Sequence, residues 1–261
     1  ELLISAISAW QGNSGLAIGN AIGSNITNIA LILGVTAFLT PVLVARKTLS
    51  REFIILFLAT GVAWYVLHDR VLSLIDALIL LASLFVAITF LATNSEVQEE
   101  QENKCGCSLP MAFFWTIIGL VLLLVSSNML VNSSVKLAQL FGVSDLVIGL
   151  TIVAIGTSLP ELAASVTGAL KHHTDLAIGN VVGSNIFNTL GVIGVPGLIQ
   201  AYNIPNEALT RDFPIMIGLT ILLFVLALTT HKGKGMNRLS GITLLACFIA
   251  FQVTLYVQNV A

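Results

Sequence analysis

Apolar residues in this chain come in long blocks that short polar stretches separate. Most blocks are about 20 residues long, the length that an α-helix needs to cross a bilayer. The pattern therefore predicts an all-α integral membrane protein whose polar stretches are loops. The predicted helical segments, the first of them partial, are 1–10, 16–44, 53–67, 71–93, 111–131, 146–170, 176–199, 215–229 and 239–257.

The composition agrees with a membrane protein. Hydrophobic residues make up 56% of the 261 residues and charged residues only 9%, against about 25% charged residues in a soluble domain. This apolar composition makes the lipid bilayer the expected surrounding. The net charge is −2, and the sequence has no basic stripe that would indicate a nucleic-acid partner. Cys105 and Cys107 form a lone C-x-C in a polar loop, which is a weak signal for a metal or redox site.

Basic residues are distributed unequally between alternate loops. Eight lysines and arginines fall in one set of loops and three in the other. The positive-inside rule places the richer set in the cytoplasm. We therefore expect a multi-pass protein of the cell (inner) membrane, with cytoplasmic loops at 45–52, 93–109, 171–175 and 231–238.

One polar stretch occurs twice, 160 residues apart. "LAIGNAIGSNITN" spans 16–28 and "LAIGNVVGSNIFN" spans 176–188, and the same shift pairs Glu1 with Glu161. The helices that carry these glutamates are first and sixth in order, so they cross the membrane in opposite directions. Inverted repeats of this kind are typical of secondary transporters, whose substrate sites lie near the midplane where the repeats meet.

The second copy of the repeat includes the motif "GTSLPE" at 156–161. Glu161 falls near mid-span, where a carboxylate is costly unless it has partners. Pro160 has no N–H for the carbonyl of Gly156, so that carbonyl needs another partner, and a cation is a suitable one. Thr157 and Ser158 add hydroxyl oxygens one turn earlier.

Asn180, Ser184 and Asn188 follow on the next predicted helix at a spacing of four, which keeps them on one face over about 12 Å. Two copies of such a set would offer two carboxylates among hydroxyl, amide and backbone oxygens. An all-oxygen site suits a hard cation such as Ca²⁺, and the absence of His and Cys from the motifs argues against zinc or copper. Helix packing through G-x-x-x-G pairs explains the glycines but not the repeated polar set.

In these motifs the chain resembles the cation/Ca²⁺ exchanger superfamily, in the branch of sodium/calcium exchangers. The resemblance implies ten helices in two inverted five-helix halves, of which the second helix, from Glu1 onward, to the tenth are expected here. It divides the chain into first-repeat helices at 1–92, an acidic cytoplasmic loop at 93–109 and second-repeat helices at 110–261. A further helix is expected upstream of Glu1.

The resemblance also implies a set of ion ligands. They are Glu1, Ser24 and Asn28 from the first repeat, and Thr157, Ser158, Glu161, Ser184, Asn188 and the backbone oxygen of Ala154 from the second. Sodium/calcium exchangers often carry Asp at the position of Asn188. Asn keeps an oxygen ligand but carries no charge, so the coupling ion stays open.

The implied function is a secondary active antiporter that exchanges Ca²⁺ for Na⁺ by alternating access, works as a monomer, and is neither an enzyme nor dependent on a cofactor. An H⁺-coupled Ca²⁺ antiporter of the same fold is the main alternative, and a cation channel is a remote one. The spans hold no aspartate pair for an intramembrane protease. Asp76 is expected to be structural, and Asn128 and Asn132 are weaker candidates for a pathway lining.

Overall fold

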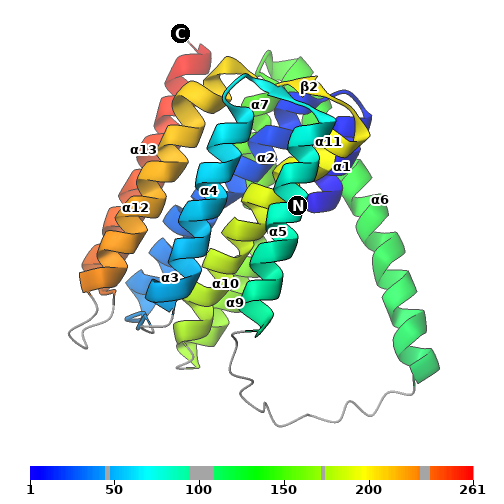
Figure 1. Cartoon of the computed structure of the whole chain (residues 1–261). Helices are drawn as coiled ribbons and strands as arrows, with labels where there is room; N and C mark the ends of the chain where they lie inside the picture. Colours follow the sequence, from blue (N-terminus) through cyan, green and yellow to red (C-terminus); the bar gives the residue numbers. More distant parts are fainter. Residues whose placement is uncertain (45–47, 94–108, 172–173, 230–235, 261) are drawn as a thin grey trace.

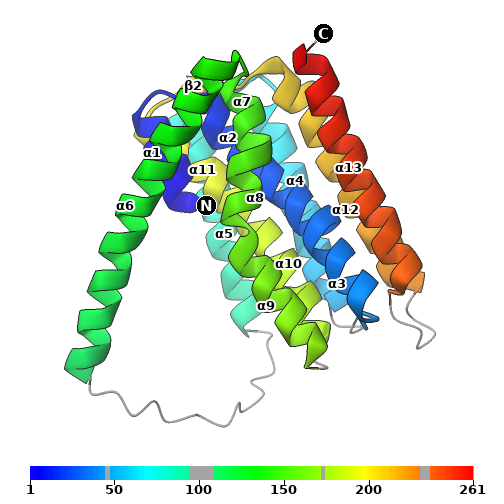
Figure 2. The same cartoon turned by 180° about the vertical axis from the view of Figure 1, so that it is seen from behind.

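The chain forms a bundle of helices, shown in Figures 1 and 2 as a computed structural model that describes residues 1–44, 48–93, 109–171, 174–229 and 236–260. Each of the nine predicted segments contains helix, but the predicted bounds are too wide at 40–44, which is not helical, and at 71–72, which forms a strand. The helices are α1 (Leu2–Trp10), α2 (Ser14–Ile26), α3 (Leu33–Leu39), α4 (Phe53–Leu67), α5 (Leu74–Thr93), α6 (Leu109–Phe141), α7 (Asp145–Ile148), α8 (Ala154–Thr157), α9 (Leu159–Leu170), α10 (Thr174–Phe187), α11 (Ile193–Ile199), α12 (Phe213–Thr229) and α13 (Arg238–Val260).

Five wider π-helical turns join or precede several of these helices. They are η1 (Thr27–Ile32), η2 (Thr48–Glu52), η3 (Gly149–Val153), η4 (Asn188–Val192) and η5 (Ala208–Asp212). Turns of this type are rare and are frequently found at functional sites. Continuous runs such as α2–η1–α3 are thereby long enough to cross a membrane.

The prediction of an all-α membrane protein is confirmed. Within the described residues, six helical runs are long and apolar enough to span a bilayer, and the bent run from Asp145 to Leu170 is a seventh. The predicted cytoplasmic loops fall partly outside the described ranges. The acidic loop at 94–108, with Cys105 and Cys107, lies wholly outside them.

The two halves of the chain repeat the same elements in opposite directions. α11 begins 160 residues after α3, and η5 begins 160 residues after η2. In Figure 1 the run from α2 to α3 descends, whereas the run from α10 to α11 ascends. This opposed arrangement is the inverted repeat that the sequence predicts.

Short antiparallel pairings connect the halves. Strand β1 (Val71–Leu72) pairs with β2 (Tyr202–Asn203), with Leu72 opposite Tyr202. An isolated bridge joins Val42 to Met236, with N–O distances of 3.0 Å and 2.7 Å. Val42 and Tyr202 are again 160 positions apart, so each half contributes an equivalent residue to one pairing.

Helix α2 lies at the centre and touches the turn η3 backbone to backbone. A Cβ at Gly23 would lie 2.7 Å from the Cα of Leu150 and 2.7 Å from the Cβ of Ala154. From the other side, a Cβ at Gly149 would lie 2.8 Å from the carbonyl oxygen of Leu16. Small residues permit such an approach in membrane helices, and it joins the repeat motif of the first half to the motif of the second.

Helix α6 stands apart from the bundle over much of its length. Both views show its first turns diverging from the other helices. It packs mainly against α1, α7 and η3. The side chains of Asn128 and Asn132 on α6 each accept a hydrogen bond from Gln11, at 3.3 Å and 3.4 Å, and all three residues are exposed. These amides therefore link α6 to the end of α1.

Asp76 has the structural role that the sequence predicts. Its Oδ2 accepts from the backbone N–H of Ser73 at 2.9 Å and from the hydroxyl of Ser73 at 2.6 Å. The backbone N–H of Asp76 in turn donates to the Ser73 hydroxyl at 3.3 Å. This reciprocal arrangement is a capping box at the start of α5.

The close contact of α2 with η3 predicts that Gly23→Ala destabilises the protein by roughly 1–3 kcal/mol, because the added methyl group overlaps backbone atoms. Thermal unfolding of the purified protein in detergent measures the change. Gly61→Ala is the matched control, because a Cβ at Gly61 meets nothing within 4 Å. Equal unfolding midpoints for the two variants would contradict the contact.

Candidate cation site

The motif "GTSLPE" breaks a membrane helix in two. Helix α8 ends at Thr157, α9 begins at Leu159, and the two segments are bent by 43°. Ser158 lies at the break with φ −89° and ψ 1°, and Pro160 sits in the first turn of α9, where its missing N–H costs nothing. The break places Glu161 in that same turn.

Residues from the two repeats meet at this break. The Ser158 hydroxyl donates to Oε1 of Glu1 at 3.3 Å. The hydroxyls of Thr157 and Ser24 lie 3.4 Å apart, and Thr157 also donates to Oδ1 of Asn20 at 3.3 Å. The structure thus brings together four of the predicted ligands, Glu1, Ser24, Thr157 and Ser158, from helices that are distant in the sequence.

The asparagines of the two motifs form a buried network close by. The Asn28 amide donates to Oδ1 of Asn185 at 3.1 Å, and the Asn185 amide donates to the backbone oxygen of Asn25 at 3.3 Å. The Asn25 amide donates to the hydroxyl of Thr189 at 2.8 Å. Asn28 and Asn188 are both fully buried.

Several buried oxygens at the site have no hydrogen-bond partner among the described residues. They include Oδ1 of Asn28, Oδ1 of Asn188 and Oε2 of Glu161, and the amide nitrogen of Asn188 is also unpaired there. Buried polar atoms are nearly always paired, so such a group indicates a missing partner. A cation is a partner that the oxygens of the group can share.

Glu1 and Glu161 are the two carboxylates among the predicted ligands, one from each repeat. A carboxylate within a membrane span is costly unless a positive charge or hydrogen bonds compensate it. No His or Cys adds to this set, and the described residues contain no group of three or more His, Cys, Asp and Glu side chains that could hold a metal. The donors are therefore two carboxylates and neutral oxygens.

The remaining predicted ligands are Ala154 and Ser184. The carbonyl oxygen of Ala154 accepts from the N–H of Ser158 at 3.1 Å and from the hydroxyl of Thr157 at 3.2 Å. The Thr157 hydroxyl would have to turn to free a lone pair for an ion. Ser184 is half-buried on α10, one turn before Asn188.

Each repeat also contains the same bond between its glutamate helix and its asparagine helix. The Asn20 amide donates to the hydroxyl of Ser5 at 3.1 Å, and the Asn180 amide donates to the hydroxyl of Ser165 at 3.3 Å. The Asn20 amide also donates to the backbone oxygen of Glu1 at 3.3 Å. These bonds fix the helix that carries each glutamate against the helix that carries the amides.

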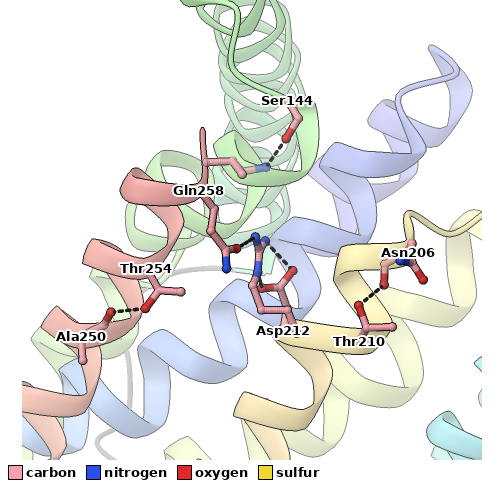
Figure 3. Close-up of polar contacts among 9 residues, drawn as sticks. Ser144, Asn206, Thr210, Asp212, Ala250, Thr254 and Gln258 are labelled. Carbon is pink, nitrogen blue, oxygen red and sulfur yellow. Dashed lines mark hydrogen bonds and ion pairs between the residues drawn. The ribbon is translucent and has the colours of Figure 1, made fainter. Parts of the chain in front are cut away.

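Sequence reasoning missed a buried ion pair at the start of α12. The carboxylate of Asp212 is fully buried and accepts from Nε of Arg211 at 2.6 Å and from Nη2 at 3.1 Å. Nη1 of Arg211 donates to Oε1 of Gln258 at 2.6 Å, which ties η5, just before α12, to the end of α13. Asp212 and Gln258 are shown in Figure 3. The signal was present, because "TLSREF" at 48–53 recurs as "ALTRDF" at 208–213 with the same shift.

Inverted repeats that meet at a broken membrane helix, with carboxylates and unpaired oxygens at the junction, define a secondary transporter. The family model described as "Sodium/calcium exchanger protein" matches residues 1–93 and 111–257 of the chain. The chain therefore belongs to the sodium/calcium exchanger family, whose members are membrane antiporters and not enzymes.

Relatives and a solved structure agree with this assignment. The inner membrane protein YrbG of Escherichia coli is 36% identical, over 98% of this chain and 82% of its own. The sodium/calcium exchanger MaX1 of Methanosarcina acetivorans is 30% identical, over 98% of this chain and 84% of its own. A structure of the sodium-calcium exchanger NCX_Mj with Na⁺ and Sr²⁺ matches with a TM-score of 0.70 and 31% identity, over 95% of this chain and 80% of that one.

The buried pair at Arg211 predicts that Arg211→Gln lowers the free energy of unfolding by about 3 kcal/mol, because the Asp212 carboxylate loses its countercharge. Thermal unfolding in detergent measures this loss. The matched control is Arg238→Gln, which removes an exposed arginine at the start of α13. A double variant with Asp212→Asn should recover part of the stability. If Arg211→Gln unfolds at the same temperature as the control, the pair is not stabilising.

Proposed function

We propose that this protein exchanges Ca²⁺ for Na⁺ across the membrane by alternating access at the junction of the two repeats. The proposed ligands share an oxygen donor and a place in the repeated motifs. They are Glu1, Ser24, Asn28, Thr157, Ser158, Glu161, Ser184, Asn188 and the backbone oxygen of Ala154.

The observation that carries this proposal is the group of buried oxygens without partners, namely Oδ1 of Asn28, Oδ1 of Asn188 and Oε2 of Glu161. Ca²⁺ takes roughly 6–8 oxygen ligands. Two carboxylates with surrounding hydroxyls and amides can supply that number. Family membership supports the same cargo, since relatives are named for sodium/calcium exchange.

The charge of the site sets the expected competition between ions. Glu1 and Glu161 together carry −2, which one Ca²⁺ neutralises, and two Na⁺ would neutralise it equally. Asn28 and Asn188 are neutral and change nothing in this balance. Exchange of one Ca²⁺ for two Na⁺ would therefore move no net charge across the membrane.

The same charge balance supports a second candidate, which is an H⁺-coupled Ca²⁺ antiporter. Two protons would also neutralise Glu1 and Glu161. Asn188 favours this alternative, because sodium/calcium exchangers often carry Asp there. Flux driven separately by a Na⁺ gradient and by a pH gradient distinguishes the two. Flux that persists with no counter-ion on the far side would instead indicate a channel.

We also propose the orientation that the positive-inside rule predicts. The ends of the bundle near η2 and near the start of α13 would then face the cytoplasm. The glutamate and amide motifs lie between the two ends. Accessibility of single cysteines placed at Ser50 and Asn206 to a membrane-impermeant thiol reagent would assign the sides.

The proposed role of Glu161 as a ligand predicts that Glu161→Gln lowers Ca²⁺ affinity by roughly 30-fold or more. The reason is that the bound Ca²⁺ would lose one of the two negative charges that neutralise it. Calorimetric Ca²⁺ titration of the protein and ⁴⁵Ca²⁺ uptake into proteoliposomes measure binding and flux. Glu207→Gln, which removes an exposed carboxylate before η5, is the matched control. Ca²⁺-dependent flux of Glu161→Gln at the wild-type rate would refute the two-glutamate site.

The neutral charge balance predicts that an imposed membrane potential leaves exchange by the wild-type protein unchanged. Asn188→Asp adds a third negative charge to the site, so the exchange should become voltage-dependent, with about 2.3 kcal/mol of driving force per charge for each 100 mV. Uptake measured with potassium and valinomycin at set potentials tests this. Asn206→Asp makes the same chemical change at an exposed residue and should not alter the response. A voltage-dependent wild type would disprove the 2:1 exchange.

A further inference from the structure

A long apolar groove runs along the outside of the bundle between α4 and α5. Its cavity has a volume of about 650 Å³, which is within the range of roughly 300–1,000 Å³ for small-molecule sites. The rims are large side chains that face outward, with Ile54 54%, Leu58 65% and Val86 65% exposed. The groove therefore opens on the surface that the bilayer covers.

The groove exists because the facing positions of the two helices carry small residues. Ala59 of α4 and Ala82, Ser83 and Ala87 of α5 line it, and Leu190 of η4 lies at its floor. Larger side chains at these positions would fill the space by packing α4 directly on α5.

The length of the groove matches one leaflet. Its lining on the continuous run η2–α4 extends from Ser50 to Val62, which is roughly 18 Å along a helix axis. The hydrocarbon core of a bilayer is about 30 Å thick, so one leaflet contributes about half of that. The groove thus runs from the membrane surface at the start of α4 to near the midplane.

The two ends of the groove differ in chemistry. Ser50 and Arg51 line the end at the membrane surface, and both are exposed. Beyond them the lining is apolar as far as Val62 and Ile79, apart from Ser83, whose hydroxyl donates to the backbone oxygen of Ile79 at 2.8 Å. A guanidinium at the mouth of an apolar groove matches a phosphate group attached to a hydrocarbon chain, because arginine binds phosphate with two parallel hydrogen bonds.

We propose that this groove binds one phospholipid with an anionic headgroup, whose acyl chain lies between α4 and α5 and whose phosphate contacts Arg51. Basic pockets between membrane helices on the cytoplasmic side bind anionic lipids in this way. The predicted cytoplasmic placement of 45–52 fits this arrangement. The proposal does not depend on which ion drives transport.

The floor of the groove connects the lipid to the ion site. Leu190 is two residues after Asn188, in the same π-helical turn η4. The adjacent residue Thr189 accepts the hydrogen bond from Asn25 at 2.8 Å. An acyl chain packed on Leu190 would support the turn that carries Asn188 and Thr189.

Native mass spectrometry of the protein mixed with phosphatidylglycerol or phosphatidylcholine of identical chains tests the proposal. We expect the wild type to retain phosphatidylglycerol roughly fivefold better, as one arginine contributes about 1 kcal/mol near a membrane surface. Arg51→Gln should abolish this preference. Ala82→Phe, which fills the groove from an exposed position, should reduce retention of both lipids.

Two variants are matched controls. Arg238→Gln removes an exposed arginine of α13, and Ala246→Phe adds the same bulk at an exposed position of α13; neither residue lines the groove. Both controls should retain phosphatidylglycerol as the wild type does. Equal retention of the two lipids by the wild type, an unchanged preference in Arg51→Gln, or unchanged occupancy in Ala82→Phe would each overturn the proposal.

Discussion

Hydrocarbon offers no hydrogen bonds, and this constraint governs every polar group within the spans of this protein. An unsatisfied backbone or side-chain group costs several kcal/mol there. Several amides are paired with a hydroxyl of another helix, as Asn20 is with Ser5 and Asn180 with Ser165. The oxygens of Asn28, Asn188 and Glu161 that have no partner among the described residues are therefore candidate ligands for a positive ion.

The duplication explains how so many polar groups can be paired at all. Two copies in opposite orientation present complementary donors and acceptors at a shared junction, so Asn28 of one copy binds Asn185 of the other. The glycines of α2 allow its backbone to touch η3, and this contact brings Thr157 within reach of Ser24. The same packing that stabilises the bundle therefore assembles the oxygens of the site.

The side chains at the periphery of the bundle contact lipid, so their composition differs from that of the centre. Large aliphatic side chains face outward on α4 and α5, as the bilayer requires, and small residues between these helices leave a groove instead of a tight seam. Placing an arginine within hydrocarbon is energetically unfavourable, so arginines of membrane helices are usually paired with another group or lie near a helix end. Arg211 is neutralised by a buried aspartate, and Arg51 lines the mouth of the groove.

The linear pattern alone determined the helices, the inverted repeat and the identity of the oxygen-bearing motifs. Apolar blocks of bilayer length and a constant shift of 160 residues are local or periodic properties, and they can be recognised without any knowledge of contacts. The sequence also showed that Pro160 has no N–H for the carbonyl of Gly156, although 146–170 was predicted as one segment and the break at Ser158 came from the structure. The repeat of Arg51–Phe53 at Arg211–Phe213 was equally present in the sequence. The sequence did not show that Arg211 pairs with Asp212 and binds Gln258.

Only the tertiary structure decided which of these groups meet. That Ser158 reaches Glu1, that Asn28 reaches Asn185, and that Arg211 reaches Gln258 all depend on how helices distant in sequence are packed. The groove between α4 and α5 is likewise a property of two facing surfaces, and no single helix contains it. Contacts of this kind are set by interhelical distance and rotation, which a periodic pattern of residues does not specify.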